Sequence, residues 1–175
     1  MDLKTAIRAI PDHPKPGIVY RDITPLMADG EAFRRTVEGL ASAFKAHRID
    51  KVAGIEARGF VFGAALATAL GAGFVPVRKR GKLPHDTISR SYSLEYGEDV
   101  LELHRDAVAP GERVLLIDDL IATGGTAVAA AELLAELGAR PVACAFVIEL
   151  EGLGGREALA GLTDEVFSLM QFGDD

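Results

Sequence analysis

The sequence has only one cysteine and no tryptophan. Because Cys144 has no second cysteine to pair with, no disulfide can form within the chain, which fits a reducing compartment. Its apolar context, PVACAFVIEL, indicates a core residue rather than a nucleophile. The first ten residues lack the unbroken apolar core of a signal peptide, and the longest apolar helix candidate, residues 59–70, is too short to span a bilayer. We therefore expect a cytoplasmic protein.

Two common phosphate-binding motifs are also missing. There is no G-x-x-x-x-G-K-[ST] and no G-x-G-x-x-G after an expected strand, which excludes a P-loop and a dinucleotide-binding fold. The net charge of −7 argues against a nucleic-acid or membrane-surface partner, although local basic patches could still bind phosphates. We find no repeats, low-complexity tracts or linkers, so residues 1–175 are predicted to form a single domain.

Hydrophobic spacing predicts an α/β fold. A short N-terminal helix is expected to end before Pro11, and an extended Pro-rich loop follows it. The succession of a strand at 51–55, a turn, a helix at 59–70 and a strand at 73–77 implies a right-handed crossover and a parallel sheet. The other expected elements are helices at 31–46 and 127–137 and strands at 114–117, 142–150 and 166–170.

The most informative segment is VLLIDDLIATGGT, residues 114–126. Four branched apolar residues fit a buried parallel strand, so Asp118 and Asp119 are expected at its carboxyl end, where ligands bind in open α/β sheets. Ionised carboxylates only accept hydrogen bonds, which suits paired sugar hydroxyls. Residues 123–126 offer backbone N–H groups and two hydroxyls at a helix N-terminus, which suits an anion. Either pair alone would indicate a solvated strand end or a flexible turn; together they predict a site for a phosphorylated ribose.

Residues 78–104 form a basic and polar insertion between core strands. Gly81 and Pro84 interrupt it, and residues 100–104 alternate as in a strand. Long insertions in compact domains are usually functional or disordered, so we expect an active-site flap. Arg78, Lys79, Arg80 and Lys82 would be a solvated face by composition alone, but their place after a strand in an acidic protein favours an anion site.

VLLIDDLIATGGT resembles the phosphoribosyl pyrophosphate (PRPP) motif of type I phosphoribosyltransferases, and the chain from Pro14 to Phe172 resembles the adenine-specific members of that family. The resemblance also covers PKPGIVYRDITPL, GIEARGFVFG, VRKRGKLP, SYSLEYG and the pair GREAL and FSLMQF, all in the family's order. It implies the type I phosphoribosyltransferase fold, which is a central, mainly parallel sheet flanked by helices, with a flexible catalytic loop and a small N-terminal hood at about residues 1–30.

By resemblance, the expected reaction transfers the 5-phosphoribosyl group from PRPP to adenine and yields AMP and pyrophosphate, a step of purine salvage. The family implies Mg²⁺ carried by the PRPP oxygens, with no dedicated metal site on the protein, and a homodimer. No nucleic-acid or membrane partner is expected.

The resemblance also assigns roles to single residues. The 5′-phosphate is assigned to Ala122, Thr123, Gly124, Gly125 and Thr126, and the ribose to Asp118 and Asp119. Pyrophosphate is assigned to Glu56, Ala57, Arg58, Arg78, Lys79 and Lys82. The family further implies a cis peptide bond between Glu56 and Ala57, where some members carry Asp-Ser.

Catalysis and base recognition are assigned to two other segments. Glu95 is the candidate general acid/base for the proton that adenine loses, and Tyr96 of the flap would cover the closed site. Adenine is assigned to Val19, Tyr20 and Arg21, whose backbone can read its polar edge while Tyr20 stacks on the ring. Many relatives carry Phe at the position of Tyr20, so stacking is expected to persist.

Three other functions remain open at the level of sequence. The same fold could serve another base, such as hypoxanthine, guanine or xanthine, but VYRDITPL and SYSLEYG favour adenine. A non-catalytic PRPP-sensing regulator is disfavoured because the chain is acidic and has no appended DNA-binding domain. A sugar-phosphate isomerase or kinase with a similar sheet would lack these motifs.

Overall fold

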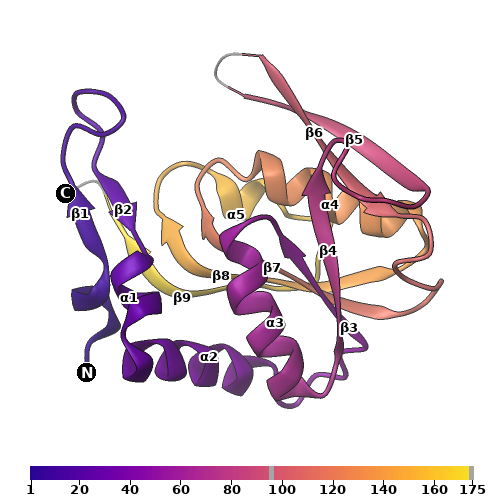
Figure 1. Cartoon of the computed structure of the whole chain (residues 1–175), viewed down its shortest axis with the longest axis horizontal. Helices are drawn as coiled ribbons and strands as arrows, with labels where there is room; N and C mark the ends of the chain where they lie inside the picture. Colours follow the sequence, from indigo (N-terminus) through magenta and orange to yellow (C-terminus); the bar gives the residue numbers. More distant parts are fainter. Residues whose placement is uncertain (95–96, 174–175) are drawn as a thin grey trace.

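The computed structural model describes residues 1–94 and 97–173. A seven-stranded sheet runs through the molecule in the order β5-β6-β4-β3-β7-β8-β9 (Figure 1). Its parallel part consists of β4 (Gly73–Lys79), β3 (Lys51–Ile55), β7 (Arg113–Ile121), β8 (Arg140–Leu150) and β9 (Val166–Phe172). The predicted α/β fold with a mainly parallel sheet is therefore confirmed.

Helices cover both faces of the sheet. Successive residues of β7 point to opposite faces, and because residues 114–117 are all apolar, both faces have to be covered. Val114 and Leu116 pack in one core cluster with α4 (Gly125–Glu136). Leu115 and Ile117 pack in the other cluster with α2 (Gly30–Phe44) and α3 (Arg58–Leu70). All four strand residues are completely buried, as expected for a strand with no polar face.

Helix α3 approaches the sheet at unusually short range where it begins. A Cβ added at Gly59 would lie 2.9 Å from the Asp118 carboxylate and 3.2 Å from the carbonyl oxygen of Ile117. No side chain fits in that space, so glycine is required at this position. The close approach brings the start of α3, and with it Arg58, against the end of β7.

The predicted N-terminal helix is wrong beyond its first turn. Residues Leu3–Ala6 form a single 3₁₀ turn (η1), after which β1 (Arg8–Ile10) pairs antiparallel with β2 (Tyr20–Asp22). Pairing with a segment ten residues away overrides the helical spacing of the apolar residues. The expected extended loop thus contains a strand and also α1 (Thr24–Ala28), whose first residue is held by the Asp22 carboxylate. These two strands lie apart from the main sheet, beside β9 and facing the carboxyl ends of β7 and β8 (Figure 1).

The insertion at residues 78–104 is more regular than a loop. Strands β5 (Thr87–Ser93) and β6 (Glu98–His104) form an antiparallel hairpin that joins the sheet edge at β4. Arg90 of this hairpin forms ion pairs with Glu132 (2.9 Å) and Glu136 (3.4 Å) of α4. The middle of the hairpin is therefore fixed to α4, the helix that follows β7. Among the described residues, no helix is long and apolar enough to cross a membrane.

Cys144 lies in β8 and is completely buried, as its sequence context predicts. Burial raises the pKa of its thiol to about 12. In the unfolded chain the thiol ionises near pH 8.5. Between these two pH values the thiol stays protonated in the native protein but ionises in the unfolded chain. The free energy of unfolding therefore falls as the pH rises from about 8.5 towards 12.

We expect Ellman's reagent at pH 8 to leave the native protein unlabelled and to label one thiol per chain in urea, because only the unfolded chain exposes a thiolate. The absorbance of the released thiolate reports the labelling. Cys144→Ser is the control and should abolish the signal in urea. Rapid labelling of the native protein would contradict the buried position.

Candidate functional site

The two neighbouring carboxylates lie where one strand outruns its neighbour. Strand β7 pairs with β3 only as far as Gly54↔Ile117, whereas its pairing with β8 continues to Ile121↔Glu149. Asp118 and Asp119 are therefore inside the strand and not after it, which corrects the predicted strand end at residue 117. The reason is that hydrogen bonding to β8 continues after β3 has stopped. The carboxylates still lie at the carboxyl edge of the sheet on the side that β3 leaves open.

Asp119 and Arg58 form an ion pair at this edge. The Arg58 Nε lies 2.5 Å from the Asp119 Oδ2, and only 7% of Asp119 is exposed. The hydrogen bond to Asp119 raises the pKa of Arg58. Burial, together with the charge of Asp119, raises the pKa of Asp118. At this edge the charge of Asp119 is therefore neutralised by Arg58, whereas ionisation of the neighbouring Asp118 is unfavourable unless further hydrogen-bond donors approach it.

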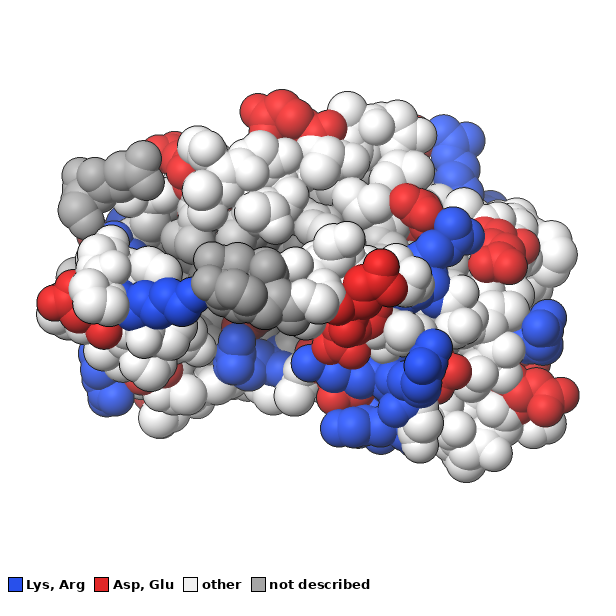
Figure 2. Space-filling model, turned by 90° about the horizontal axis from the view of Figure 1, so that it is seen from above, with Lys and Arg blue, Asp and Glu red and all other residues white. Residues whose placement is uncertain are grey.

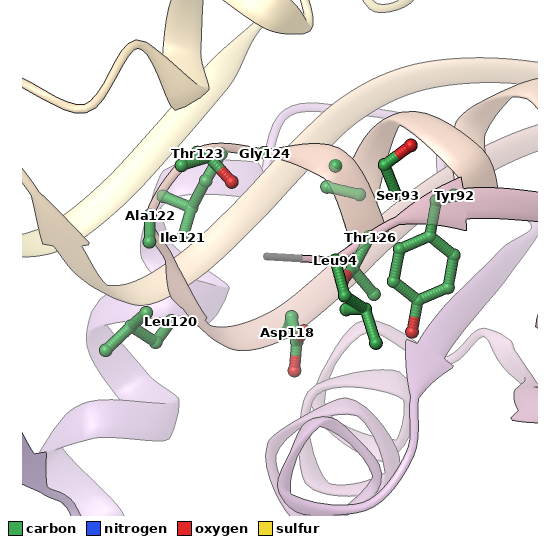
Figure 3. Close-up of a pocket in the computed structure, with 12 residues that line it drawn as sticks. Tyr92, Ser93, Leu94, Asp118, Leu120, Ile121, Ala122, Thr123, Gly124 and Thr126 are labelled. Carbon is green, nitrogen blue, oxygen red and sulfur yellow. The ribbon is translucent and has the colours of Figure 1, made fainter. Parts of the chain in front are cut away.

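The loop of residues 122–126 wraps around one side of the carboxylates. Gly124 has a φ of +90° and precedes α4, and no side chain of residues 1–94 or 97–173 caps the N–H groups of this helix start. A helix N-terminus with backbone N–H groups available favours a bound anion. Figure 3 shows the loop on one side of a cavity, with Tyr92 and Leu94 of the hairpin on the other and Asp118 below. The cavity has a volume of about 340 Å³.

A second cavity, of about 460 Å³, adjoins the first. Its own lining includes the Glu56–Arg58 turn, Lys79 and Asp99, and it shares four lining residues with the first cavity. The shared residues are Tyr92, Leu94, Asp118 and Thr126. The 122–126 loop and the Glu56–Arg58 turn therefore lie on two sides of one set of carboxylates.

Glu56 organises the basic residues at the end of β4 and just after it. Arg78 and Lys79 belong to β4 and do not follow it as predicted, because pairing with β6 prolongs the strand to Lys79. Its carboxylate accepts the backbone N–H of Lys79 (2.7 Å), and it lies 3.2 Å from the Lys82 Nζ and 3.4 Å from the Arg78 Nε. Burial opposes ionisation of Glu56, but these donors and cations prevail and lower its pKa. The peptide bond from Glu56 to Ala57 is cis, as the family resemblance implies. Seen from above, basic side chains gather in a patch with acidic side chains directly beside them (Figure 2).

Tyr92 is a lining residue that the sequence reasoning missed. Its hydroxyl lies 3.3 Å from the Asp99 carboxylate, which in turn lies 3.2 Å from the Lys79 Nζ. Burial raises the pKa of this tyrosine. The alternation of exposed serines around Tyr92 in SYS was the available signal for an inward-facing side chain. Glu95 and Tyr96, the residues chosen from the same motif, lie outside the described residues.

The N-terminal strands contribute a third hollow, of about 510 Å³, which Val19 and Arg21 line together with Ile18, Leu153 and Phe172. The Arg21 guanidinium stacks over the Phe172 ring at 4.5 Å. Tyr20 is not among the residues that line this hollow. Its ring packs edge-on against His13 at 5.2 Å. Of the three predicted base-binding residues, Val19 and Arg21 therefore line the hollow and Tyr20 does not.

Leu153 is a second lining residue that sequence reasoning missed. It precedes GREAL and is 46% exposed at the rim of the hollow. A single leucine in a glycine-rich turn gives no sequence signal for a binding role. Within residues 1–94 and 97–173, no three His, Cys, Asp or Glu side chains gather as a metal site.

Known proteins share both the sequence and this arrangement. Residues 27–170 match the family model of the phosphoribosyl transferase domain. The adenine phosphoribosyltransferase of Methylobacterium sp. (strain 4-46) is 61% identical over 170 residues, which cover 97% of this chain and 94% of that protein.

Solved structures agree with that match. The adenine phosphoribosyltransferase of Thermoanaerobacter pseudethanolicus superposes with a TM-score of 0.93 at 51% identity and covers 98% of both chains. The Saccharomyces cerevisiae enzyme, solved with an imino-altritol bisphosphate and adenine, superposes with a TM-score of 0.90 at 42% identity and covers 97% of both chains. The chain belongs to the phosphoribosyltransferase family and, within it, to the adenine phosphoribosyltransferases.

Proposed function

We propose that this enzyme transfers the 5-phosphoribosyl group of PRPP to adenine, with AMP and pyrophosphate as products of purine salvage. The observation that carries the proposal is the pair of adjoining cavities that share Asp118 and Thr126. Each cavity has its own anion-binding element, and the carboxylates lie between them. PRPP has the same order of parts, with a phosphate at one end, a pyrophosphate at the other and two ribose hydroxyls between.

The substrate is assigned to the site by charge. The 5′-phosphate would accept hydrogen bonds from the N–H groups and hydroxyls of Ala122, Thr123, Gly124, Gly125 and Thr126 at the start of α4. The ribose hydroxyls would donate to Asp118 and Asp119. Positive charge that develops on the ribose during transfer would be stabilised by the same carboxylates.

Pyrophosphate is assigned to the second cavity. Lys79 and Arg58 line it, and the Glu56–Ala57 backbone closes one side. The carboxylate of Glu56 would repel pyrophosphate, so its proposed role is to hold Arg78, Lys79 and Lys82 in place. When pyrophosphate arrives, it would compete with Asp119 for Arg58 and with Asp99 for Lys79.

Mg²⁺ is proposed to arrive with PRPP. The ion prefers substrate phosphates, waters and one or two carboxylates, and when bound it neutralises pyrophosphate charge. Of the nearest carboxylates, Asp119 is already paired with Arg58, and Asp118 accepts the backbone N–H of Asp119 at 2.8 Å. Both fit ribose hydroxyls better than a shared metal site.

Adenine is proposed to bind at the β2 segment, with Val19 and Arg21 contributing backbone groups and Tyr20 its ring. The hollow of about 510 Å³ that Val19 and Arg21 line supports this, because it lies directly beside the β2 segment. Glu95 would move the proton that adenine loses, and Tyr96 would close over the site. A homodimer in the cytoplasm completes the proposal.

The first test offers adenine, hypoxanthine, guanine and xanthine separately to the purified protein with PRPP and Mg²⁺, and chromatography measures the nucleotide formed. We expect AMP from adenine alone. Another nucleotide would keep the fold and overturn the base assignment. PRPP binding without any nucleotide would point to a non-catalytic sensor.

Asp119→Asn should weaken PRPP binding about 10- to 100-fold, because a charged acceptor for a ribose hydroxyl is lost. Isothermal titration calorimetry measures the Kd for PRPP. Asp164→Asn breaks an exposed ion pair with Arg140 (2.7 Å) and is the matched control, which should bind PRPP like the wild type. Wild-type affinity in Asp119→Asn would refute the ribose assignment.

Glu95→Gln should lower kcat about 100-fold or more while the Kd for PRPP stays close to that of the wild type, because general acid/base catalysis acts on the transition state. Steady-state kinetics with adenine, combined with PRPP titration, separates the two quantities. Glu98→Gln, at the exposed first residue of β6, is the control. An unchanged kcat would remove Glu95 from the mechanism.

A further inference from the structure

The 122–126 loop rests on a second glycine-rich segment, which leads into α5 (Gly155–Ala158). A Cβ added at Gly155 would lie 2.5 Å from the carbonyl oxygen of Ala122 and 2.6 Å from a side-chain carbon of Ile121. In the other direction, a Cβ at Gly124 would lie 3.0 Å from the carbonyl oxygen of Gly155. Neither position has room for a side chain, so the two backbones are in direct contact. Any shift of the α5 segment is therefore transmitted to the loop.

Arg156, the residue after Gly155, ties this segment to the sheet. Its guanidinium donates two hydrogen bonds to the Glu149 carboxylate (2.6 and 3.3 Å) and one to the carbonyl oxygen of Val166 (2.6 Å). The hydroxyl of Ser168 donates to the same carboxylate at 2.5 Å. We call these four groups the Arg156 brace: Arg156, Glu149, Ser168 and the Val166 carbonyl.

The brace joins three elements, because Glu149 belongs to β8, Ser168 and Val166 belong to β9, and Arg156 belongs to α5. Glu149 is only 9% exposed, so its charge needs the bonds that the brace supplies. The hydrogen bond from Arg156 is the largest influence on the pKa of Glu149 and lowers it, and the bond to Glu149 raises the pKa of Arg156. Both groups are therefore charged at neutral pH. A satisfied and partly buried network of this kind holds its members rigidly.

We propose that Arg156 is a positioning residue for the 5′-phosphate, which it serves by fixing Gly155 beneath the 122–126 loop. This inference rests on the proposed function, since it takes the loop as the site of the 5′-phosphate. Arg156 acts through the backbone contact of Gly155 with Ala122. Loss of the brace leaves the residues of the 122–126 loop unchanged. It lets the N–H groups at the start of α4 move away from the positions in which they bind the phosphate.

The test compares two ligands of the wild-type chain and its variants by calorimetry. AMP carries the 5′-phosphate and pyrophosphate does not. In Arg156→Ala we expect the Kd for AMP to rise about tenfold, because charge-assisted hydrogen bonds that hold the loop are lost, while the Kd for pyrophosphate changes less than about twofold. Arg156→Lys keeps the charge but cannot bind Glu149 and the Val166 carbonyl together. Its Kd for AMP should therefore lie between that of the wild type and that of Arg156→Ala.

Arg140→Ala is the matched control. Arg140 also pairs with a carboxylate, Asp164, but at the amino end of β8, far along the strand from Glu149. It should bind both ligands like the wild type. Urea unfolding of every variant checks that the chain is folded. If Arg156→Ala does not fold, Arg156→Lys and Ser168→Ala carry the same test with a smaller increase in the Kd for AMP.

Glu149→Gln distinguishes positioning from direct contact with the ligand. If Arg156 acts through the brace, this variant weakens AMP binding in the same direction as Arg156→Ala. If Arg156 instead attracts the phosphate with its own charge, removal of the neighbouring negative charge tightens AMP binding, and the inference is overturned. Equal losses of AMP and pyrophosphate affinity would also overturn it, since they indicate general loosening. A wild-type chain that binds no AMP would refute the proposed function itself.

Discussion

The close approach of α3 to β7 is the constraint on which the site depends. Gly59 allows the helix to start directly against Asp118, and this contact carries the preceding Arg58 to Asp119, from which it is separated by 61 positions in the chain. The Arg58–Asp119 ion pair neutralises one of two adjacent carboxylates, which would otherwise repel each other at this edge of the sheet. A side chain at Gly59 would push the helix away from the strand and leave Asp119 buried without its partner.

Local patterns in the sequence were sufficient for the core of the fold. The strand at residues 51–55 and the helix after it were predicted to within one residue, because a short apolar run and a 13-residue apolar helix are each decided by their own residues. The predicted end of β7 was wrong because two aspartates look like a strand end, whereas pairing with β8 continues past them. The N-terminal helix was wrong because β1 depends on a partner strand that spacing alone does not reveal.

The site shows the same division between local and distant information. The ligand segments were recognised because each is contiguous: the Asp-Asp pair, the 122–126 loop and the basic run that begins at the end of β4. What the sequence could not supply is which side chains meet across the fold. The Tyr92–Asp99–Lys79 chain and the Arg156 brace both join residues from different helices or strands, and no pattern within one segment indicates such contacts. The net negative charge of the chain also gives no indication that Arg78 and Lys82 lie together, which they do because both pair with Glu56.

The hollow beside β2 joins the first and last segments of the fold, since Val19 and Arg21 face Phe172 of β9 across it. During synthesis on the ribosome, the carboxylates of β7 and the loop after it are made about 50 residues before Phe172. At that point the chain already contains the residues around Asp118, whereas the hollow still lacks Phe172. Completion of the hollow is coupled to the addition of the last strand to the sheet.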